Sequence, residues 1–135
     1  MVITLEDILI LTRTIYGEAR GEPWRGQLAV GLVVRNRAVQ EHMGITTVFG
    51  QCLAPNQFSV WWQNNANTKE TLSTGVDDPV MRKCADVAIM ALRPDASDVT
   101  YGALYYAVKN VQRHWMEGMS VTTTIGSHKF LKPLG

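Results

Sequence analysis

Residues 16–26, with the sequence YGEARGEPWRG, combine the side chains that acid–base chemistry needs. Two carboxylates, Glu18 and Glu22, lie four positions apart between two apolar segments. Pairs of carboxylates carry out most glycoside hydrolysis, in which one of them donates a proton to the leaving oxygen. Partial burial against apolar and aromatic groups can keep such a carboxyl group protonated near neutral pH. We therefore predict that Glu18 is a catalytic acid.

Both glutamates also have structural interpretations. Glu18 could form a surface ion pair with Arg20 or Arg25, and the spacing alone does not exclude this. Glu22 precedes Pro23 at the start of a predicted helix, where a negative charge interacts favourably with exposed amide groups. This structural role of Glu22 competes with a role as the second catalytic carboxylate.

Histidines and cysteines give weaker indications of chemistry. His114 and His128 could suggest a zinc site, but no recognisable spacing supplies a third ligand, so we expect no metal. Cys52 with a histidine could suggest a thiol nucleophile, but nothing near it in the sequence would activate the thiol. We expect Cys52 and Cys84 to be free thiols, because Cys84 falls on the apolar face of a predicted helix; one disulfide bridge is the alternative.

A second group of residues has the chemistry for binding sugars. Aromatic rings can stack on the apolar faces of sugars, while amides can hydrogen-bond hydroxyl and N-acetyl groups. The alternative is that part of the group fills the core. Because strand side chains alternate between faces, we expect one of Tyr105 and Tyr106 to point inwards and the other into a groove. The group comprises Asn56, Gln57, Trp61, Trp62, Asn64, Asn65, Tyr105, Tyr106 and Trp115.

The predicted elements place Glu18 at the end of an apolar helix. Helical apolar spacing runs from residue 5 to residue 16, and Thr4 with Asp7 forms a loose capping box in front of it. We expect the helix to stop within residues 17–20, because Gly21 permits backbone angles that other residues avoid. Glu18 should then project from the edge of the core.

The rest of the pattern predicts a mainly helical domain with a small β element. Residues 23–40 are apolar over most of a helical circumference and predict a central buried helix, with a strand over residues 28–34 as the alternative. Residues 41–74 are irregular but rich in aromatics, so we expect an ordered loop that forms a binding surface. The remaining predictions are a helix capped by Asp78 and ending before Pro94, strands at 103–108 and 121–125, and a turn at 126–128.

Length and composition indicate a single domain over residues 1–135. Apolar residues make up 46% of the chain and charged residues 19%, as in ordinary globular proteins. The formal charge of +1 gives no electrostatic case for binding nucleic acid. The apolar runs are too short for membrane insertion, and the acids near the N-terminus do not fit a signal peptide. We expect a monomer.

Six short motifs, in order along the chain, resemble one protein family. They lie at residues 16–23, 26–31, 34–37, 56–59, 102–106 and 122–130, with the sequences YGEARGEP, GQLAVG, VRNR, NQFS, GALYY and TTTIGSHKF. Together they are similar to the SleB-like cell-wall hydrolases, a family that includes the spore cortex-lytic enzymes. Because the motifs span nearly the whole chain, the resemblance is far more specific than any one motif.

The resemblance implies an α+β, mainly α structure: a lysozyme-like fold with a small β element. It also implies a lytic transglycosylase that cleaves the β-1,4 bond between N-acetylmuramic acid and N-acetylglucosamine in peptidoglycan. The family's catalytic glutamate falls on Glu18, which would protonate the leaving oxygen and then accept a proton from the muramic 6-hydroxyl, giving a 1,6-anhydro product. No metal or organic cofactor is implied. The residues expected to bind substrate are Glu22, Gln57, Phe58, Trp61, Tyr105, Tyr106, Trp115 and His128.

Other functions stay open at this point. A hydrolytic muramidase on the same fold, a non-catalytic glycan-binding component of a lysis system and a zinc amidase are the alternatives. Secreted members of the family carry a signal peptide and often a wall-binding domain, and neither is recognised in this sequence. We therefore expect a phage endolysin or a virion-associated enzyme, made in the cytoplasm and acting on the cell wall after release, with a spore-associated protein as the alternative.

Overall fold

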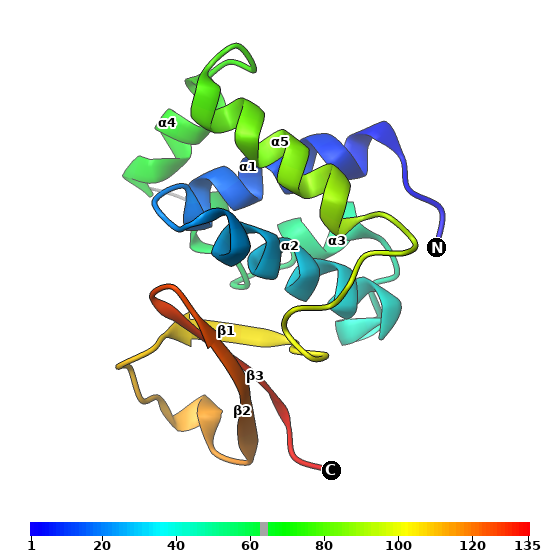
Figure 1. Ribbon diagram of the computed structural model, residues 1–135, viewed down its shortest axis with the longest axis vertical. Helices are drawn as coiled ribbons and strands as arrows, with labels where there is room; N and C mark the ends of the chain where they lie inside the picture. Colours follow the sequence, from blue (N-terminus) through cyan, green and yellow to red (C-terminus); the bar gives the residue numbers. More distant parts are fainter. Residues whose placement is uncertain (63–64) are drawn as a thin grey trace.

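The computed structural model describes residues 1–62 and 65–135. Helices form one body of the molecule, and a small sheet packs beside it (Figure 1). The helices of the described residues are α1 (Leu5–Ala19), α2 (Trp24–Val39), α3 (Val48–Leu53), α4 (Ala66–Ser73) and α5 (Pro79–Ala91), with 3₁₀ turns η1 (His42–Gly44), η2 (Ser59–Trp61) and η3 (His114–Met116). The strands are β1 (Tyr105–Val108), β2 (Met119–Ile125) and β3 (His128–Pro133).

Helix α1 begins at the predicted capping box. The Thr4 hydroxyl accepts a hydrogen bond from the Asp7 N–H at 3.2 Å, and the Asp7 carboxylate accepts one from the Thr4 N–H at 2.8 Å. The second Asp7 oxygen accepts from the Phe49 N–H at 2.9 Å, so one buried carboxylate satisfies the first turns of both α1 and α3. The helix ends at Ala19, as predicted, but Gly21 does not adopt a positive φ.

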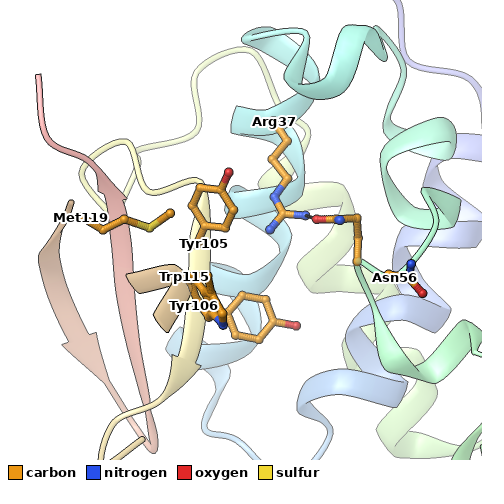
Figure 2. A pocket seen from close by; sticks show the side chains of 7 residues that line it. Arg37, Asn56, Tyr105, Tyr106, Trp115 and Met119 are labelled. Atoms are coloured by element: carbon orange, nitrogen blue, oxygen red, sulfur yellow. Dashed lines mark hydrogen bonds between the residues drawn. The ribbon is translucent and has the colours of Figure 1, made fainter. Parts of the chain in front are cut away.

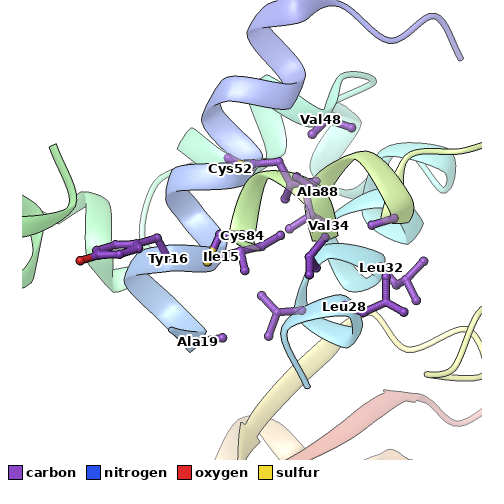
Figure 3. Packing of buried hydrophobic residues seen from close by; sticks show 14 of the residues in the cluster. Ile15, Tyr16, Ala19, Leu28, Leu32, Val34, Val48, Cys52, Cys84 and Ala88 are labelled. Carbon is purple, nitrogen blue, oxygen red and sulfur yellow. The ribbon is translucent and has the colours of Figure 1, made fainter. Parts of the chain in front are cut away.

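Helix α2 is the central helix, which confirms the helical interpretation over the strand alternative. Figure 3 shows side chains of α1, α2 and α5 pointing into a shared apolar cluster. The opposite face of α2 presents Ala29 and Val33 to Ile125 and Phe130 of the sheet. Pro23 lies just before the helix, at its N-cap, and not at the predicted first helical position. Because α2 is buried from both sides, it sets the distance between α1 and the sheet.

The segment 41–74 is more regular than predicted. It contains α3 and α4, each started by a side chain that accepts from the backbone: Thr47 from Gly50 N–H and Asn65 from Asn67 N–H. Helix α3 has six residues and α4 buries only Thr71, so neither carries the apolar repeat from which a helix is recognised. The prediction of an irregular loop was therefore wrong here, because helices this short are specified by caps and tertiary packing.

The sheet is antiparallel in the order β1-β3-β2. Both predicted strands are confirmed, but the central strand β3 was missed. Its apolar residues Phe130 and Leu131 are adjacent and not alternating, and lysines flank them, so period-2 alternation is absent. The predicted turn is the tight connection between β2 and β3, with Gly126 at φ +59° and His128 already in the strand.

The predicted class, α+β and mainly α with a small β element, is confirmed by this arrangement. The prediction of free cysteines is also confirmed: Cys52 and Cys84 are unbridged and buried. No helix of the described residues is long and apolar enough to cross a membrane.

Candidate active site

Glu18 lies in the last turn of α1, where three donors from other elements converge on its carboxylate. The Tyr106 hydroxyl of β1 donates to Oε1 at 2.7 Å. The Ser59 hydroxyl and the Val60 N–H of η2 both donate to Oε2 at 3.3 Å. Neutral donors thus orient the carboxylate of Glu18.

The surface ion pair considered for Glu18 is not formed. Arg20 pairs with Glu70 at 2.9 Å and also donates to the Tyr16 carbonyl. Within residues 1–62 and 65–135, no basic nitrogen lies within 4.0 Å of the Glu18 carboxylate. Glu18 is therefore a half-buried carboxylate held by neutral groups, an arrangement suited to proton transfer.

Tyr106 is fixed in the geometry that serves Glu18. Its ring packs against Phe58, His128 and Phe130, with ring centroids 6.5, 5.1 and 6.0 Å away. Burial, together with the neighbouring Glu18 carboxylate, raises the pKa of the Tyr106 phenol well above its usual value. The phenol therefore keeps its proton and acts as a donor to Glu18.

Gly17 allows η2 to approach α1 closely enough to reach Glu18. A Cβ atom at this position would lie 2.7 Å from the Cβ of Val60 and closer still to one of its methyl groups. The contact is held by two further hydrogen bonds, from Asn67 Nδ2 to the Gly17 carbonyl at 2.6 Å and from the Thr68 hydroxyl to the Val60 carbonyl. The glycine directly before Glu18 in the sequence thus has a packing reason.

Gly17→Ala is expected to lower the free energy of unfolding by about 1–3 kcal/mol, because the added methyl group must push Val60 away from α1. Urea denaturation followed by circular dichroism measures the change. The matched control is Gly21→Ala: a Cβ there meets no atom within 4 Å, and the φ of Gly21 is not positive. We expect the control to stay within about 0.5 kcal/mol of wild type, and equal losses in the two variants would contradict the packing argument.

Tyr106 lines a cavity of about 440 Å³ and also donates a hydrogen bond to Glu18, so the cavity adjoins this carboxylate. Figure 2 shows side chains that line the cavity. Trp115 tilts against Tyr105 with centroids 5.7 Å apart, and Gln57 adds an amide to the wall. Aromatic faces and amides are the groups that a sugar ring needs from its binding site. The lining residues are Arg37, Asn56, Gln57, Tyr105, Tyr106, Trp115 and Met119.

The predicted substrate-binding residues separate into two sets. Gln57, Tyr105, Tyr106 and Trp115 come together at the cavity, and both tyrosines line it, although only one was expected to. Phe58 is 1% exposed and packs in the core under Tyr106, so its side chain has no surface to offer a substrate.

Of the other members of the predicted aromatic and amide group, Asn56 also lines the cavity, whereas Trp61, Trp62 and Asn65 do not. Trp61 donates from Nε1 to the Thr14 hydroxyl at 2.9 Å and lines a separate apolar hollow with Phe49. Asn65 caps α4. Asn64 lies outside the described residues.

Glu22 does not cap α2, which begins without a side-chain cap. Its carboxylate accepts from the Ser127 N–H at 2.9 Å and the Ser127 hydroxyl at 2.5 Å, and His128 Nδ1 lies 3.4 Å away. Burial opposes ionisation of Glu22, but the Ser127 hydrogen bonds and the nearby His128 and Lys109 lower its pKa below the usual value. Gly126 is needed at this contact, because a Cβ there would lie 2.5 Å from a Glu22 oxygen.

The Glu22 contact ties the β2–β3 turn to the start of α2, close to the Glu18 site. The side chain of His128 is 12% exposed, and its ring forms a T-shaped contact with the ring of Tyr106. Glu22 is thus linked to Glu18 through His128 and Tyr106. Direct contact of Glu22 or His128 with substrate stays a prediction.

Arg37, near the end of α2, was not predicted as a functional residue. The available signal was its spacing: Arg37 lies four and three residues after Val33 and Val34, on a face that is otherwise apolar. The structure buries its guanidinium in the wall of the cavity.

The structure offers little support for metal or thiol chemistry. No group of three His, Cys, Asp or Glu residues in the described parts of the chain could hold a metal ion. Burial raises the pKa of Cys52 to about 12 and that of Cys84 to about 11, so both thiols stay protonated. His114 is exposed and lies 3.4 Å from Glu117.

Comparison with known proteins places the chain in a family. The Cell Wall Hydrolase family profile matches residues 21–131. A spore cortex-lytic enzyme of Bacillus cereus is 30% identical over 129 residues, covering 93% of this chain and 44% of that protein. That of Bacillus subtilis strain 168 is 29% identical over 99 residues, covering 67% of this chain and 30% of that protein. The chain thus spans less than half the length of these relatives.

Two solved structures have the same fold. The catalytic domain of the germination-specific lytic transglycosylase SleB from Bacillus anthracis superimposes with a TM-score of 0.74 and 27% identity, over 96% of this chain and 97% of that one. The catalytic domain of the Bacillus cereus SleB protein gives a TM-score of 0.75 and 26% identity, over 97% and 93%. The lysozyme-like fold implied by the sequence motifs is confirmed by these matches. With most of its length matched by the family profile, the chain belongs to the cell wall hydrolase family.

Proposed function

We propose that this chain degrades peptidoglycan as a lytic transglycosylase, with Glu18 as both general acid and general base. The observation that carries the proposal is the Glu18 carboxylate, oriented by Tyr106, Ser59 and Val60 beside a cavity lined by aromatic rings and amides. The similarity to the SleB catalytic domain from Bacillus anthracis, itself named a lytic transglycosylase, supports the same reaction.

The proposed reaction needs one carboxyl group in two protonation states. Protonated Glu18 gives its proton to the glycosidic oxygen as the bond from that oxygen to C1 of N-acetylmuramic acid breaks, and N-acetylglucosamine leaves. The resulting carboxylate then takes the proton of the muramic 6-hydroxyl as its oxygen bonds to C1. The products are a chain with a 1,6-anhydromuramic end and a chain with a free hydroxyl, and Glu18 is protonated again.

Neighbouring groups support both halves of this cycle. Tyr106 keeps its proton and stabilises the carboxylate by a short hydrogen bond, while Ser59 and Val60 fix the other oxygen. This chemistry does not require a second carboxylate. The other glutamate, Glu22, accepts hydrogen bonds from Ser127. A glycan strand would lie across Tyr105 and Trp115, whose rings line the cavity.

The test is the mass of the fragments released from purified peptidoglycan, before and after borohydride reduction. A lytic transglycosylase gives fragments lighter by one water than those of a hydrolase, and the reduction leaves their anhydro ends unchanged. Fragments with a reducible end would overturn the proposal in favour of a muramidase. Binding to the wall without soluble fragments would favour a glycan-binding component. Access to the wall by phage-type release, and a monomeric state, stay predictions.

A further inference from the structure

The wall of the cavity beside Glu18 contains a buried cation. Arg37 is 4% exposed, and its guanidinium donates from Nε to the Leu104 carbonyl at 2.6 Å and from Nη1 to Gln57 Oε1 at 3.0 Å. The rings of Tyr105 and Phe58 lie 5.1 and 5.2 Å from the guanidinium carbon. Figure 2 shows the Arg37 side chain reaching into the cavity beside Tyr105. All of these partners are neutral.

Among the described residues, Arg37 has no carboxylate partner. Within residues 1–62 and 65–135, no carboxylate oxygen lies within 4.0 Å of its guanidinium. The nearby Cys52 thiol and Tyr106 phenol stay neutral, because burial raises the pKa of each. Burial, and then the Arg37 charge, lower the pKa of the neighbouring His42, so this residue adds no counter-charge. Proteins rarely bury a charge without a counter-charge unless a ligand supplies one.

The guanidinium also has donor capacity to spare. Arginine carries five N–H groups in a planar fork, and Nη2 of Arg37 makes no hydrogen bond to the described residues. Arg37 is one of the residues that line the cavity, so its guanidinium lies at the cavity wall. A planar anion entering the cavity would therefore meet an N–H donor and an unbalanced positive charge together.

We propose that Arg37 binds a carboxylate of the peptidoglycan strand in this cavity, so that the site prefers strands that carry free carboxylates. The inference rests on the proposed function and deepens it. Carboxylates are the anionic groups that peptidoglycan carries close to the scissile bond: the lactyl group of muramic acid where the peptide is absent, and the stem peptide where it is present. A cavity of about 440 Å³ has room for such a group together with part of a sugar.

The experiment compares three substrates for the wild-type chain: peptidoglycan, the same material with its carboxylates converted to amides by carbodiimide and ammonia, and strands freed of peptides by an amidase. We expect kcat/KM to fall at least about 10-fold on amidation, mainly through KM. Preference for the peptide-free strands would identify the lactyl carboxylate as the ligand, and preference for intact material the peptide. Equal cleavage of carboxylated and amidated strands would overturn the inference while leaving the proposed function standing.

Arg37→Gln and Arg37→Lys test the residue itself. The ratio of kcat/KM on carboxylated and amidated strands does not depend on the folded fraction of a variant. We expect a ratio near that of wild type for Arg37→Lys and a ratio of about 1 for Arg37→Gln, since only the lysine keeps the charge. The control is Arg35→Gln, also on α2, whose side chain lines a different hollow and donates to Ala96; it should keep the wild-type ratio.

Binding of soluble strand fragments to Glu18→Gln protein is measured in parallel, so that the preference can be observed without turnover. Tighter binding of carboxylated than of amidated fragments supports the inference even if the reaction is not the one proposed. Equal binding, or a preference that survives Arg37→Gln, overturns it. If the wild-type protein cleaves none of the three substrates, the result contradicts the proposed function but not the inference about Arg37. The binding data then decide the role of Arg37.

Discussion

Glu18→Gln is expected to reduce the release of soluble fragments from peptidoglycan by at least about 10³-fold, because the amide keeps the shape of the side chain but cannot donate and recover a proton. The variant should stay folded, since its oxygen can still accept from Tyr106. Loss of turbidity of purified peptidoglycan measures the rate, and circular dichroism verifies the fold. A rate near that of wild type would show that Glu18 is not the acid.

Glu22→Gln is the matched control, with the same exchange of carboxylate for amide four residues away. It weakens the contact with Ser127 and should cost about 1–2 kcal/mol of stability, because a hydrogen bond to a charged group is lost. We expect its activity to fall much less than that of Glu18→Gln. Equal losses in both variants would favour a mechanism with two catalytic carboxylates.

Tyr106→Phe is expected to lower kcat by about 10- to 100-fold, the equivalent of one hydrogen bond to a charged group. The ring stays packed against Phe58 and Phe130, so the change removes only the 2.7 Å donor to Glu18. KM should change little, because the hydroxyl acts on the acid and not on the glycan. Initial rates over a range of peptidoglycan fragment concentrations separate the two parameters.

Tyr105→Phe provides the comparison within the same strand. Its hydroxyl makes no hydrogen bond within the described parts of the chain, while its ring lines the cavity. We expect a small effect on kcat, because the ring is retained. Any larger effect should be on KM. A loss of kcat as large as that of Tyr106→Phe would contradict the special position of Tyr106.

The elements predicted best are those specified by neighbouring residues. The capping box of α1, the central helix α2 and the Asp78-capped α5 follow from caps and apolar repeats within a few positions. The short helices α3 and α4 and the strand β3 were missed, because each is too short or too irregular in pattern to be recognised without its packing partners. The same limit applied to Phe58, whose burial is a property of the assembled core.

The order of residues along the chain is enough to place two glutamates in a glycine-containing segment between two apolar segments, to predict that Glu18 lies at the end of an apolar helix, and to show which family the motifs resemble. The partners of these side chains, by contrast, depend on how the chain folds. Tyr106 meets Glu18 across 88 positions of sequence, and Ser127 meets Glu22 across 105. Helix caps and periodicity act over about four residues and can be inferred from the chain, whereas contacts across such separations depend on strand register and on how α1, α2 and the sheet pack together.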